Sequence, residues 1–404
     1  MLITTTYDVA IVGGGMVGLA TACGLAQAGI KTLMIDAGQC EAVSGEPRLR
    51  VSALNQASQR LLTSLGAWPL LAPDRIGPYR RMQVWDKDGM GHIQFDAAQL
   101  GEHTLGSIVE NDAVSYALSQ CAAELPQLTC LSHARLDKLA FGEREAWLTL
   151  ESGEQFAAAL VIAADGAQSR VRQICQIPLT FWDYGHHALV TTVQTELPHE
   201  QTARQVFLSD GVLAFLPLHD ANQSAIVWSV SPEKAASLLG CDEHEFEKSL
   251  TAAFDGRMGL CRLSGSRQRR AFPLRMRYAR HFARHRLLLA GDAAHTIHPL
   301  AGQGANLGLL DAGAIIDTVT ELHQAGKDIG EYRNLRALER WRKADAVEMI
   351  AAMEGFKQLF SGNNPVKKAL RDLGLNLVDS VSPLKSLFIR QAMGNKASLP
   401  TLCR

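Results

Sequence analysis

Short apolar runs, each followed by a glycine-containing turn, give the N-terminal part of this chain its pattern. Residues 7–12 (YDVAIV) are apolar and β-branched, which is typical of a parallel strand buried on both faces. Residues 16–28 are small and mostly apolar and lead to Gly29, so they predict a helix that ends there. Residues 31–36 (KTLMID) predict a second strand. Together they form a β-α-β unit.

Two later apolar runs end in the same way. Residues 160–164 lead to Asp165-Gly166, and residues 287–290 lead to Gly291-Asp292, after which a helix is predicted to begin near Asn306. A sheet built from all these strands must be discontinuous in sequence, because a different segment lies between them. That segment contains short runs rich in Val, Thr and aromatic residues, bounded by Pro, Gly and Asn, which predict a β-sheet over 181–274.

The chain is therefore predicted to be α/β, or α+β overall, with an inserted sheet and a helical C-terminal region. The dinucleotide-binding part comprises 1–75, 101–180 and 275–345, the substrate-binding sheet comprises 76–100 and 181–274, and the C-terminal region comprises 346–404.

Composition narrows the class of protein. The 404 residues are 47% hydrophobic and 20% charged with a net charge of −1, as expected for two or three globular domains that do not bind nucleic acid. The eight cysteines include no C-x-x-C pair, and no run reaches about 18 apolar residues. The first apolar run leads straight into the glycine loop, so we expect it to be a core strand and not a signal peptide. We expect reduced thiols and a cytoplasmic location.

The first turn carries candidate chemistry. Gly13, Gly15 and Gly18 fit G-x-G-x-x-G, in which the glycines permit a tight turn, close approach of a pyrophosphate and close helix packing. Asp36 follows at the end of the second strand, where an acid can bind ribose hydroxyls. An acid there favours FAD or NAD over NADP.

The last motif favours a flavin. A carboxylate at Asp292 could bind ribityl hydroxyls, and the backbone of Gly302, Gln303 and Gly304 could present a helix N-terminus to the ring edge that gains negative charge on reduction.

These three motifs, in this order, resemble the flavin-dependent aromatic hydroxylases built like p-hydroxybenzoate hydroxylase. The segment LRVSALN (49–55) resembles the Arg segment of that family, and FWDYGHHALVTTV and GDAAHTIHPLAGQGANLG resemble the bacterial ubiquinone-biosynthesis hydroxylases, in particular their 2-polyprenylphenol hydroxylase group. The resemblance implies a glutathione-reductase-like FAD domain. It assigns to the flavin site Gly13, Gly15, Val17, Gly18, Asp36, Arg50, Asp165, Gly166, Gly291, Asp292, Pro299, Gly302, Gln303, Gly304 and Asn306.

By the same resemblance, the reaction is hydroxylation ortho to a phenol through a C4a-hydroperoxyflavin, with O2 and a transiently bound NAD(P)H or another electron donor near Asp165 and Arg170. No side chain is assigned as catalytic, although His186, His187, His295 and His298 are eligible bases. An apolar wall for a prenyl tail is predicted from Phe207, Phe215, Leu216, Pro217 and Trp228, whose alternative role is ordinary sheet core. No metal is expected.

Three alternatives remain open. The first is a hydroxylase for another ring position or another aromatic. The second is a flavin-dependent halogenase or saturating reductase, of which the halogenase is disfavoured because W-x-W-x-I-P is missing. The third is a flavin-containing assembly subunit without turnover. Residues 355–404 carry eight Lys or Arg and two Asp, and 366–381 read as an amphipathic helix. That helix could dock on its own domain, contact another subunit or a partner protein, or lie on a membrane surface. Residues 262–286 contain nine Arg and no Asp or Glu, and one or two of these Arg could bind a nucleotide phosphate.

Overall fold

A computed structural model describes residues 5–89, 91–297, 303–360, 394 and 398–404. The predicted N-terminal unit is present as β1 (Thr5–Val12), α1 (Met16–Gln27) and β2 (Thr32–Ile35). It belongs to an eight-stranded sheet with the order β18-β19-β11-β1-β2-β8, to which β10 and β9 are added beside β11. The remaining strands of this sheet are β8 (Leu128–Leu131), β9 (Leu136–Phe141), β10 (Ala146–Leu150), β11 (Gln155–Ala163), β18 (Ala283–Arg284) and β19 (Leu287–Leu289).

The register of the parallel strands explains why the three motifs meet. Val12 of β1 pairs with Ile35 of β2 and with Ala163 of β11, and Ala163 also pairs with Leu289 of β19. Four strands from three distant segments therefore end at the same edge, and a motif residue follows each strand within two positions. Ligands bind at the carboxyl ends of the strands in such sheets.

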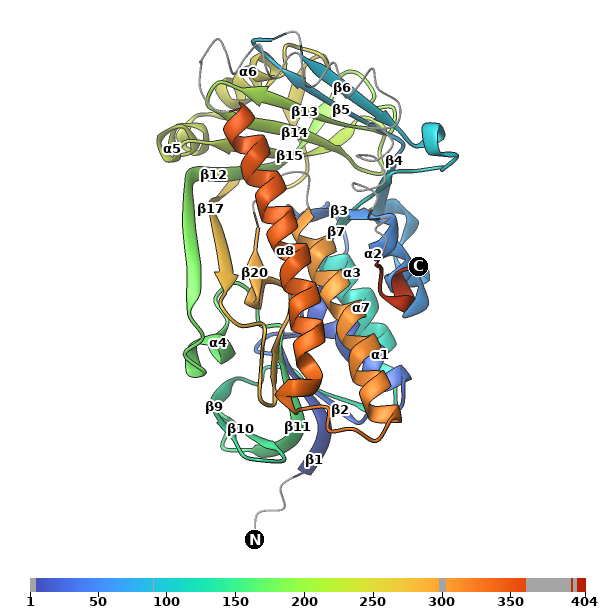
Figure 1. Ribbon diagram of the computed structural model, residues 1–404. Helices are drawn as coiled ribbons and strands as arrows, with labels where there is room; N and C mark the ends of the chain where they lie inside the picture. The colour runs from blue at the N-terminus through green and yellow to red at the C-terminus, as the bar shows by residue number, and fades with distance from the viewer. Residues whose placement is uncertain (1–4, 90, 298–302, 361–393, 395–397) are drawn as a thin grey trace.

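A nine-stranded sheet lies beyond this edge (Figure 1). Its order is β20-β17-β12-β15-β14-β13-β5-β6, with β16 beside β12. The strands are β5 (Arg81–Asp86), β6 (His92–Asp96), β12 (Leu179–Thr195), β13 (Thr202–Leu208), β14 (Gly211–Pro217), β15 (Gln223–Val230), β16 (Cys261–Leu263), β17 (Arg270–Ala279) and β20 (His295–Thr296). Most of this sheet comes from the region predicted to be β, but β20 comes directly after the Gly291-Asp292 turn.

A three-stranded sheet stands between the two larger ones (Figure 1). It consists of β3 (Val51–Asn55), β7 (Gly106–Glu110) and β4 (Ile76–Tyr79). The segment 76–79 thus joins β3 and β7, whereas we assigned it by sequence to the substrate sheet.

Seven helices follow α1 in the described residues. They are α2 (Gln56–Ser64), α3 (Asn111–Ala123), α4 (Arg170–Ile174), α5 (Pro232–Gly240), α6 (Glu243–Ala253), α7 (Gln303–Gln324) and α8 (Tyr332–Phe360), with short 3-10 turns at Trp68–Leu70, Pro73–Arg75, Ala97–Leu100, Gly291–Ala293 and Thr401–Cys403. Helix α7 begins three residues before the predicted position. The predicted helix 366–381 lies outside the described residues. Within the described ranges, none of the helices combines the length and apolar composition needed to cross a bilayer.

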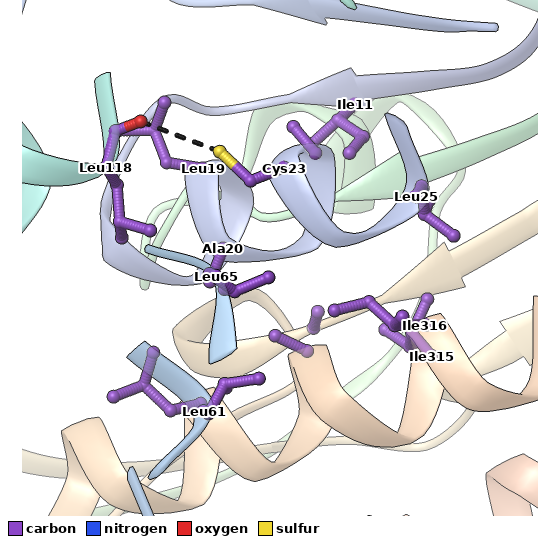
Figure 2. Packing of buried hydrophobic residues seen from close by; sticks show 14 of the residues in the cluster. Ile11, Leu19, Ala20, Cys23, Leu25, Leu61, Leu65, Leu118, Ile315 and Ile316 are labelled. Atoms are coloured by element: carbon purple, nitrogen blue, oxygen red, sulfur yellow. Dashed lines mark hydrogen bonds between the residues drawn. The ribbon is translucent and has the colours of Figure 1, made fainter. Parts of the chain in front are cut away.

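Helices α1 and α7 pack closely because α1 carries small residues. A Cβ on Gly24 would overlap the Cδ1 of Ile316, so the glycine lets this side chain lie directly against α1. Figure 2 shows Ile315 and Ile316 directed at the α1 side chains, with Cys23 donating to the Leu118 carbonyl on the other side at 3.5 Å. The core surrounds α1 and fixes the position of the glycine loop relative to the start of α7.

Candidate functional site

The glycine loop has the geometry that its motif requires. Gly13 has φ +110°, and a Cβ at this position would overlap the backbone at Ala164, immediately before Asp165. A Cβ on Gly18 would overlap the Gly13 carbonyl oxygen. The first and third glycines are therefore needed by the protein itself, to bring the loop against β11 and the helix against the loop.

Gly15 differs, because a Cβ on it would meet nothing within 4 Å. It is the N-cap residue of α1, and no side chain caps this helix end. There is therefore open space beside this helix end, and no N-cap side chain bonds to the first amides of α1. A helix N-terminus with free amides attracts phosphate.

Asp36 lies beside this loop, as predicted. Its carboxylate accepts hydrogen bonds from the Gly14 amide and, at 2.7 Å, from the Gly38 amide. The acid at the end of β2 is therefore held next to the N-terminus of α1, within reach of a ribose attached to the same pyrophosphate.

Asp165 contributes an unsatisfied acceptor at the same edge. Its Oδ2 accepts from the Val171 amide at 3.1 Å, but its Oδ1 is buried without a hydrogen-bond partner in the described part of the protein. Leaving a buried acceptor unsatisfied costs about 1–3 kcal/mol. Such an atom in a native protein points to a ligand hydroxyl or amide.

Arg172 ties two of the motifs together and was missed by sequence reasoning. Its guanidinium donates to the Ala167 carbonyl at 2.7 Å and to the Ala293 carbonyl at 2.9 Å, so it bridges the turn after β11 and the turn after β19. Burial lowers its pKa, which the charge of Asp165 partly offsets. The only sequence signal was its place in a short Arg-containing helix.

Asp292 lies in the turn that follows β19. Its side chain is accessible to solvent, yet desolvation by the surrounding protein raises the pKa of its carboxyl. His295, Arg50 and Arg277 act in the opposite direction, so all three charges lie near this carboxylate. The structure thus brings Arg50, from the segment before β3, to the motif after β19. Arg277 of β17 was foreseen only as one of nine arginines.

The Gly291-Asp292 turn packs closely against neighbouring elements. Gly291 has φ +57°, and a Cβ on it would approach Val17 to 3.1 Å. A Cβ on Gly308 of α7 would approach the same Val17 to 2.8 Å and the Gly291 Cα to 3.3 Å. The first turn of α1, the Gly-Asp turn and α7 therefore converge on Val17.

The side chain of Asn306 bonds to other residues of the protein beside the site. Its Oδ1 accepts from the Asn55 amide at 2.9 Å and from the Ser58 hydroxyl at 2.7 Å, and its Nδ2 donates to the Ala53 carbonyl. Since both polar groups are engaged and the residue is 2% exposed, its side chain holds α7 against β3 rather than reaching a cofactor.

The remaining predicted flavin residues divide into two groups. Gly166, with φ +80°, and Gly304 of α7 are at the motif edge, and Gln303 begins α7. Pro299 and Gly302 lie outside the described residues, as does His298.

The predicted apolar wall is split by the alternation of the strands. Phe215 and Trp228 are 2% and 1% exposed and pack beneath α5 and α6, where the Phe215 ring centroid is 3.9 Å from that of Phe254. Our prediction for these two is corrected: they are core on the outer face of the sheet, away from the motifs. Successive side chains of a strand point to opposite faces.

Leu216 lies on the inner face, in a cluster with Ala53 and Tyr79 of the three-stranded sheet. Phe207 packs with Val84 and Ile93 near the far edge of the nine-stranded sheet, and Pro217 is buried at the end of β14. The partly buried Val227 and Met276 belong to the inner face and were missed, because the sequence does not reveal which face is inner.

Of the eligible histidines, His295 alone contacts a motif element among the described residues. His186 bonds to the Tyr184 carbonyl at 3.1 Å in an irregular part of β12, and His187 lies near Asp183 and Glu233. Within the described residues, neither histidine side chain forms a hydrogen bond to a flavin motif.

The residues at the strand edge fit a flavin dinucleotide. Four groups lie along this edge: the N-terminus of α1, the carboxylate of Asp36 beside it, the unsatisfied oxygen of Asp165 and the carboxylate of Asp292. They supply an anion site and three hydroxyl acceptors.

Comparison with known proteins agrees with this geometry. Residues 6–336 match the family model described as "FAD binding domain". The chain is 37% identical over 389 residues to 3-demethoxyubiquinol 3-hydroxylase of Escherichia coli (strain K12), covering 96% of this chain and 98% of that protein. It is 34% identical to human ubiquinone biosynthesis monooxygenase COQ6, mitochondrial, covering 94% and 91%.

A solved structure of similar fold is p-nitrophenol 4-monooxygenase PnpA from Pseudomonas putida DLL-E4, with a TM-score of 0.78, 19% identity and coverage of 98% of this chain and 100% of that chain. At this identity the likeness concerns the fold alone. The family match and the two full-length relatives, taken with the site geometry, show that this chain belongs to the FAD-binding monooxygenase family of these hydroxylases and is an FAD-dependent monooxygenase.

Proposed function

We propose that this protein hydroxylates the ring of a polyprenylated phenol in ubiquinone biosynthesis, and that its substrate is a 2-polyprenylphenol oxidised at the carbon ortho to the hydroxyl. The observation that carries the proposal is the junction of a flavin-binding edge with an apolar sheet. Strand β20 leaves the Asp292 turn and immediately pairs with β17, with Tyr278 opposite His295. A ring docked on this sheet is therefore next to the flavin.

The inner face of the sheet suits an apolar substrate. Leu216, Val227, Leu274 and Met276 lie on it, and Val227 and Met276 retain accessible surface. Burial of each methylene of a prenyl tail against such a face stabilises the complex by about 0.8 kcal/mol.

Bound FAD supplies the activation of dioxygen that phenol oxidation needs. The protein supplies position: the α1 amides hold the pyrophosphate, Asp36 and Asp165 accept from hydroxyls, and Asp292 with Arg50 and Arg277 orients the ring-bearing end. We propose NAD(P)H or another donor as the reductant, and a homo-oligomer or other ubiquinone-biosynthesis proteins as partners. A role of 355–404 at a membrane surface stays a prediction, since 361–393 lies outside the described residues.

A second candidate differs in substrate and in ring position. The relative at 37% identity is a 3-demethoxyubiquinol 3-hydroxylase, which favours hydroxylation of a demethoxyubiquinol. Both candidates use the same flavin site and the same apolar face, so the substrate test must include both compounds.

The decisive experiment removes the gene from its quinone-producing host and identifies the intermediate that accumulates by mass spectrometry. We expect a prenylphenol that disappears on complementation. Accumulation of a demethoxyubiquinol selects the second candidate, and unchanged quinone with no intermediate rejects both.

A purified-enzyme assay complements this result. The FAD-loaded protein is given NADPH and either a short-chain 2-prenylphenol or a demethoxyubiquinol. We expect a product heavier by one oxygen from the first compound only, with oxygen from labelled O2. Loss of this product in Val227→Asp, with FAD still bound, supports the inner-face site.

A further inference from the structure

The three-stranded sheet places one buried acid between the starts of its two outer strands. Glu110 is the last residue of the central strand β7 and is 3% exposed. On one side it pairs with Val51, the first residue of β3, which directly follows Arg50. On the other side, the register of β4 with β7 puts Arg75, the residue before β4, level with Glu110. Glu110 is therefore next to the backbone that carries Arg50 and next to Arg75.

Both carboxylate oxygens of Glu110 are engaged. Oε1 accepts a hydrogen bond from Nη1 of Arg75 at 3.0 Å, and Oε2 accepts from the backbone amide of Arg48 at 2.8 Å. The side chain of Arg75 is only 10% exposed, and its Nη2 donates to the Gly45 carbonyl. Its Nε also lies 3.9 Å from the exposed carboxylate of Asp74. The buried pair of Glu110 and Arg75 thus holds the chain before β3 at two backbone positions.

This stretch of chain has no regular structure of its own. Residues 37–50 form neither a helix nor a strand. Glu110 is also the N-cap residue of α3, but its side chain does not bond to an amide of that helix. A segment without a ladder of backbone hydrogen bonds opens easily unless other contacts fix it. The Glu110 carboxylate is therefore committed to the irregular segment and not to the helix that follows it.

Arg50 is the last residue of this segment. Its carbonyl accepts from the Asn111 amide at 3.0 Å, and its side chain is exposed. Within the described ranges, the Arg50 guanidinium forms no hydrogen bond or ion pair, although its charge acts on Asp292. Strand β3, which follows Arg50, is bonded to the first turn of α7 through Asn306. The cationic group thus lies at the flavin edge, and its reach depends on where the backbone before β3 is held.

We propose that Glu110 and Arg75 are positioning residues for the bound flavin. Their ion pair anchors the irregular segment before β3 and so holds the Arg50 guanidinium at the flavin edge. This inference deepens the proposed function, on which it rests, because it names the side chains that place Arg50 beside the ring-bearing end of FAD. Neither Glu110 nor Arg75 belongs to a flavin motif of the sequence.

An arginine at position 75 suits this role better than a lysine. Two separate acceptors, Oε1 of Glu110 and the Gly45 carbonyl, are bonded by the two Nη atoms of one guanidinium. A lysine ammonium could keep the ion pair, but it is a single point charge on a flexible stem and would not bridge both acceptors in a fixed geometry. Arg75 also neutralises the buried carboxylate, which without it would be an unpaired charge next to the Arg50 backbone.

The first test uses protein without FAD and measures amide hydrogen exchange by mass spectrometry. Glu110→Gln removes one of the two acceptor oxygens that Arg48 and Arg75 share. We expect peptides covering 45–50 to exchange at least about 10-fold faster than in the wild type, while unchanged exchange in β1 and α1 shows that the fold is intact. Arg75→Lys, which keeps the charges balanced, should give a smaller increase in the same peptides. Wild-type exchange over 45–50 in Glu110→Gln would overturn the proposal.

The second test is a double-mutant cycle with Arg50→Gln, in which FAD dissociation constants are measured by fluorescence. We expect Arg50→Gln and Glu110→Gln each to weaken FAD binding about 10-fold, as for loss of a hydrogen bond to a charged group. The double variant should bind FAD no more weakly than Arg50→Gln alone, because the anchor acts through Arg50. A loss of about 100-fold in the double variant, the product of two independent effects, would contradict the proposal.

The third measurement is the reduction potential of the bound flavin, which a loss of fold stability alone would not move. A nearby cation stabilises reduced, anionic flavin, so Arg50→Gln should lower the potential. Glu110→Gln should lower it as well, and Arg75→Lys should lie between Glu110→Gln and the wild type. A wild-type potential in Glu110→Gln would show that Arg50 keeps its place without the anchor, against the proposal.

The matched control is Asp328→Asn. It breaks the ion pair of Asp328 with the buried Arg286, 2.6 Å long, at the other end of β19 from Gly291. This variant should lose stability but keep the wild-type FAD affinity, flavin potential and exchange over 45–50. An equal loss of FAD affinity in this control would mean that Glu110 acts through general stability, and the positioning role would be rejected.

These measurements also separate the positioning role from the proposed function. If the wild type binds no FAD, the proposed function fails. If Arg50→Gln keeps the wild-type affinity and potential, Arg50 has no role at the flavin and the positioning role of Glu110 and Arg75 fails with it. If Arg50→Gln weakens FAD binding and Glu110→Gln does not, only the positioning role fails.

Discussion

Asn306 donates a hydrogen bond from Nδ2 to the backbone carbonyl of Ala53 at 2.8 Å, across 253 positions of sequence. The contact joins the first turn of α7 to β3, next to the position of Arg50. It explains how a helix from the last flavin motif and an arginine from the first quarter of the chain keep a fixed separation.

Replacing Asn306 with Ala should therefore destabilise the protein. The change leaves the Asn55 amide, the Ser58 hydroxyl and the Ala53 carbonyl without a buried partner. We expect a loss of about 2–4 kcal/mol in the free energy of unfolding, measured by urea denaturation. Asn334→Ala, which removes one bond to the Asp328 carbonyl near the surface, is the control and should cost about 1 kcal/mol or less. Equal losses would show that the Asn306 contacts contribute little.

Two glycines of the first motif should respond differently to alanine. Gly15→Ala adds a methyl group where nothing lies within 4 Å, so the apo-protein should keep its melting temperature while FAD affinity falls at least about 10-fold, since the added group enters the pyrophosphate space. Gly18→Ala would place its Cβ against the Gly13 carbonyl and should lower the melting temperature even without FAD. Thermal unfolding and FAD titration of the two apo-proteins check this. Unchanged FAD affinity in Gly15→Ala would contradict our position for the pyrophosphate.

Neighbouring residues of β14 should separate stability from substrate binding. Phe215→Ala removes a ring packed against Phe254 in the outer core, and should cost about 3–5 kcal/mol of stability. Leu216→Ala acts on the inner face and should raise KM for the prenylated substrate, with a smaller effect on unfolding. Steady-state kinetics and denaturant unfolding of both variants provide the measurement. A KM change in Phe215→Ala but not in Leu216→Ala would contradict our placement of the substrate on the inner face.

The pH dependence of stability has a specific contributor in His199. Its Nε2 donates to the Asp220 carbonyl at 2.9 Å, its Nδ1 accepts from the Gln201 amide at 3.0 Å, and it is 5% exposed. Burial lowers its pKa below the usual 6.5, although its bonds to backbone carbonyls partly offset this. The unfolded chain therefore binds a proton at a higher pH than the folded protein does.

It follows that the stabilisation from neutral His199 is complete above pH 6.5 and is lost as the pH falls through the lower folded pKa. Urea unfolding from pH 7.5 to 5 should show that the wild type loses more stability than His199→Asn over this range. The exposed His219, changed to Asn, is the control and should leave the wild-type slope unchanged. A wild-type slope equal to that of His199→Asn would exclude this role for His199.

Local pattern was sufficient for the elements at the flavin edge. The apolar run before Gly13 and the small residues of α1 define a strand and a close-packed helix by residue type and spacing alone, and the same spacing puts an acid at position 36 beside the glycine loop. Those features depend on neighbours within about 30 residues, as in any β-α-β unit. For this reason α1 ends at Gln27, two residues before the predicted Gly29.

Contacts between distant segments could be decided only by the tertiary structure. The resemblance assigned Asn306 to the flavin site, but its side chain bonds to β3. Phe215 and Leu216 are both apolar and adjacent in sequence, yet they point to opposite faces of one sheet. Arg172, Arg277 and Asp311 belong to no local motif, and each lies near the Gly291-Asp292 turn, which is at least 14 residues away in sequence. A sequence sets which groups can donate, accept or be buried, while partner and face depend on how the whole chain packs.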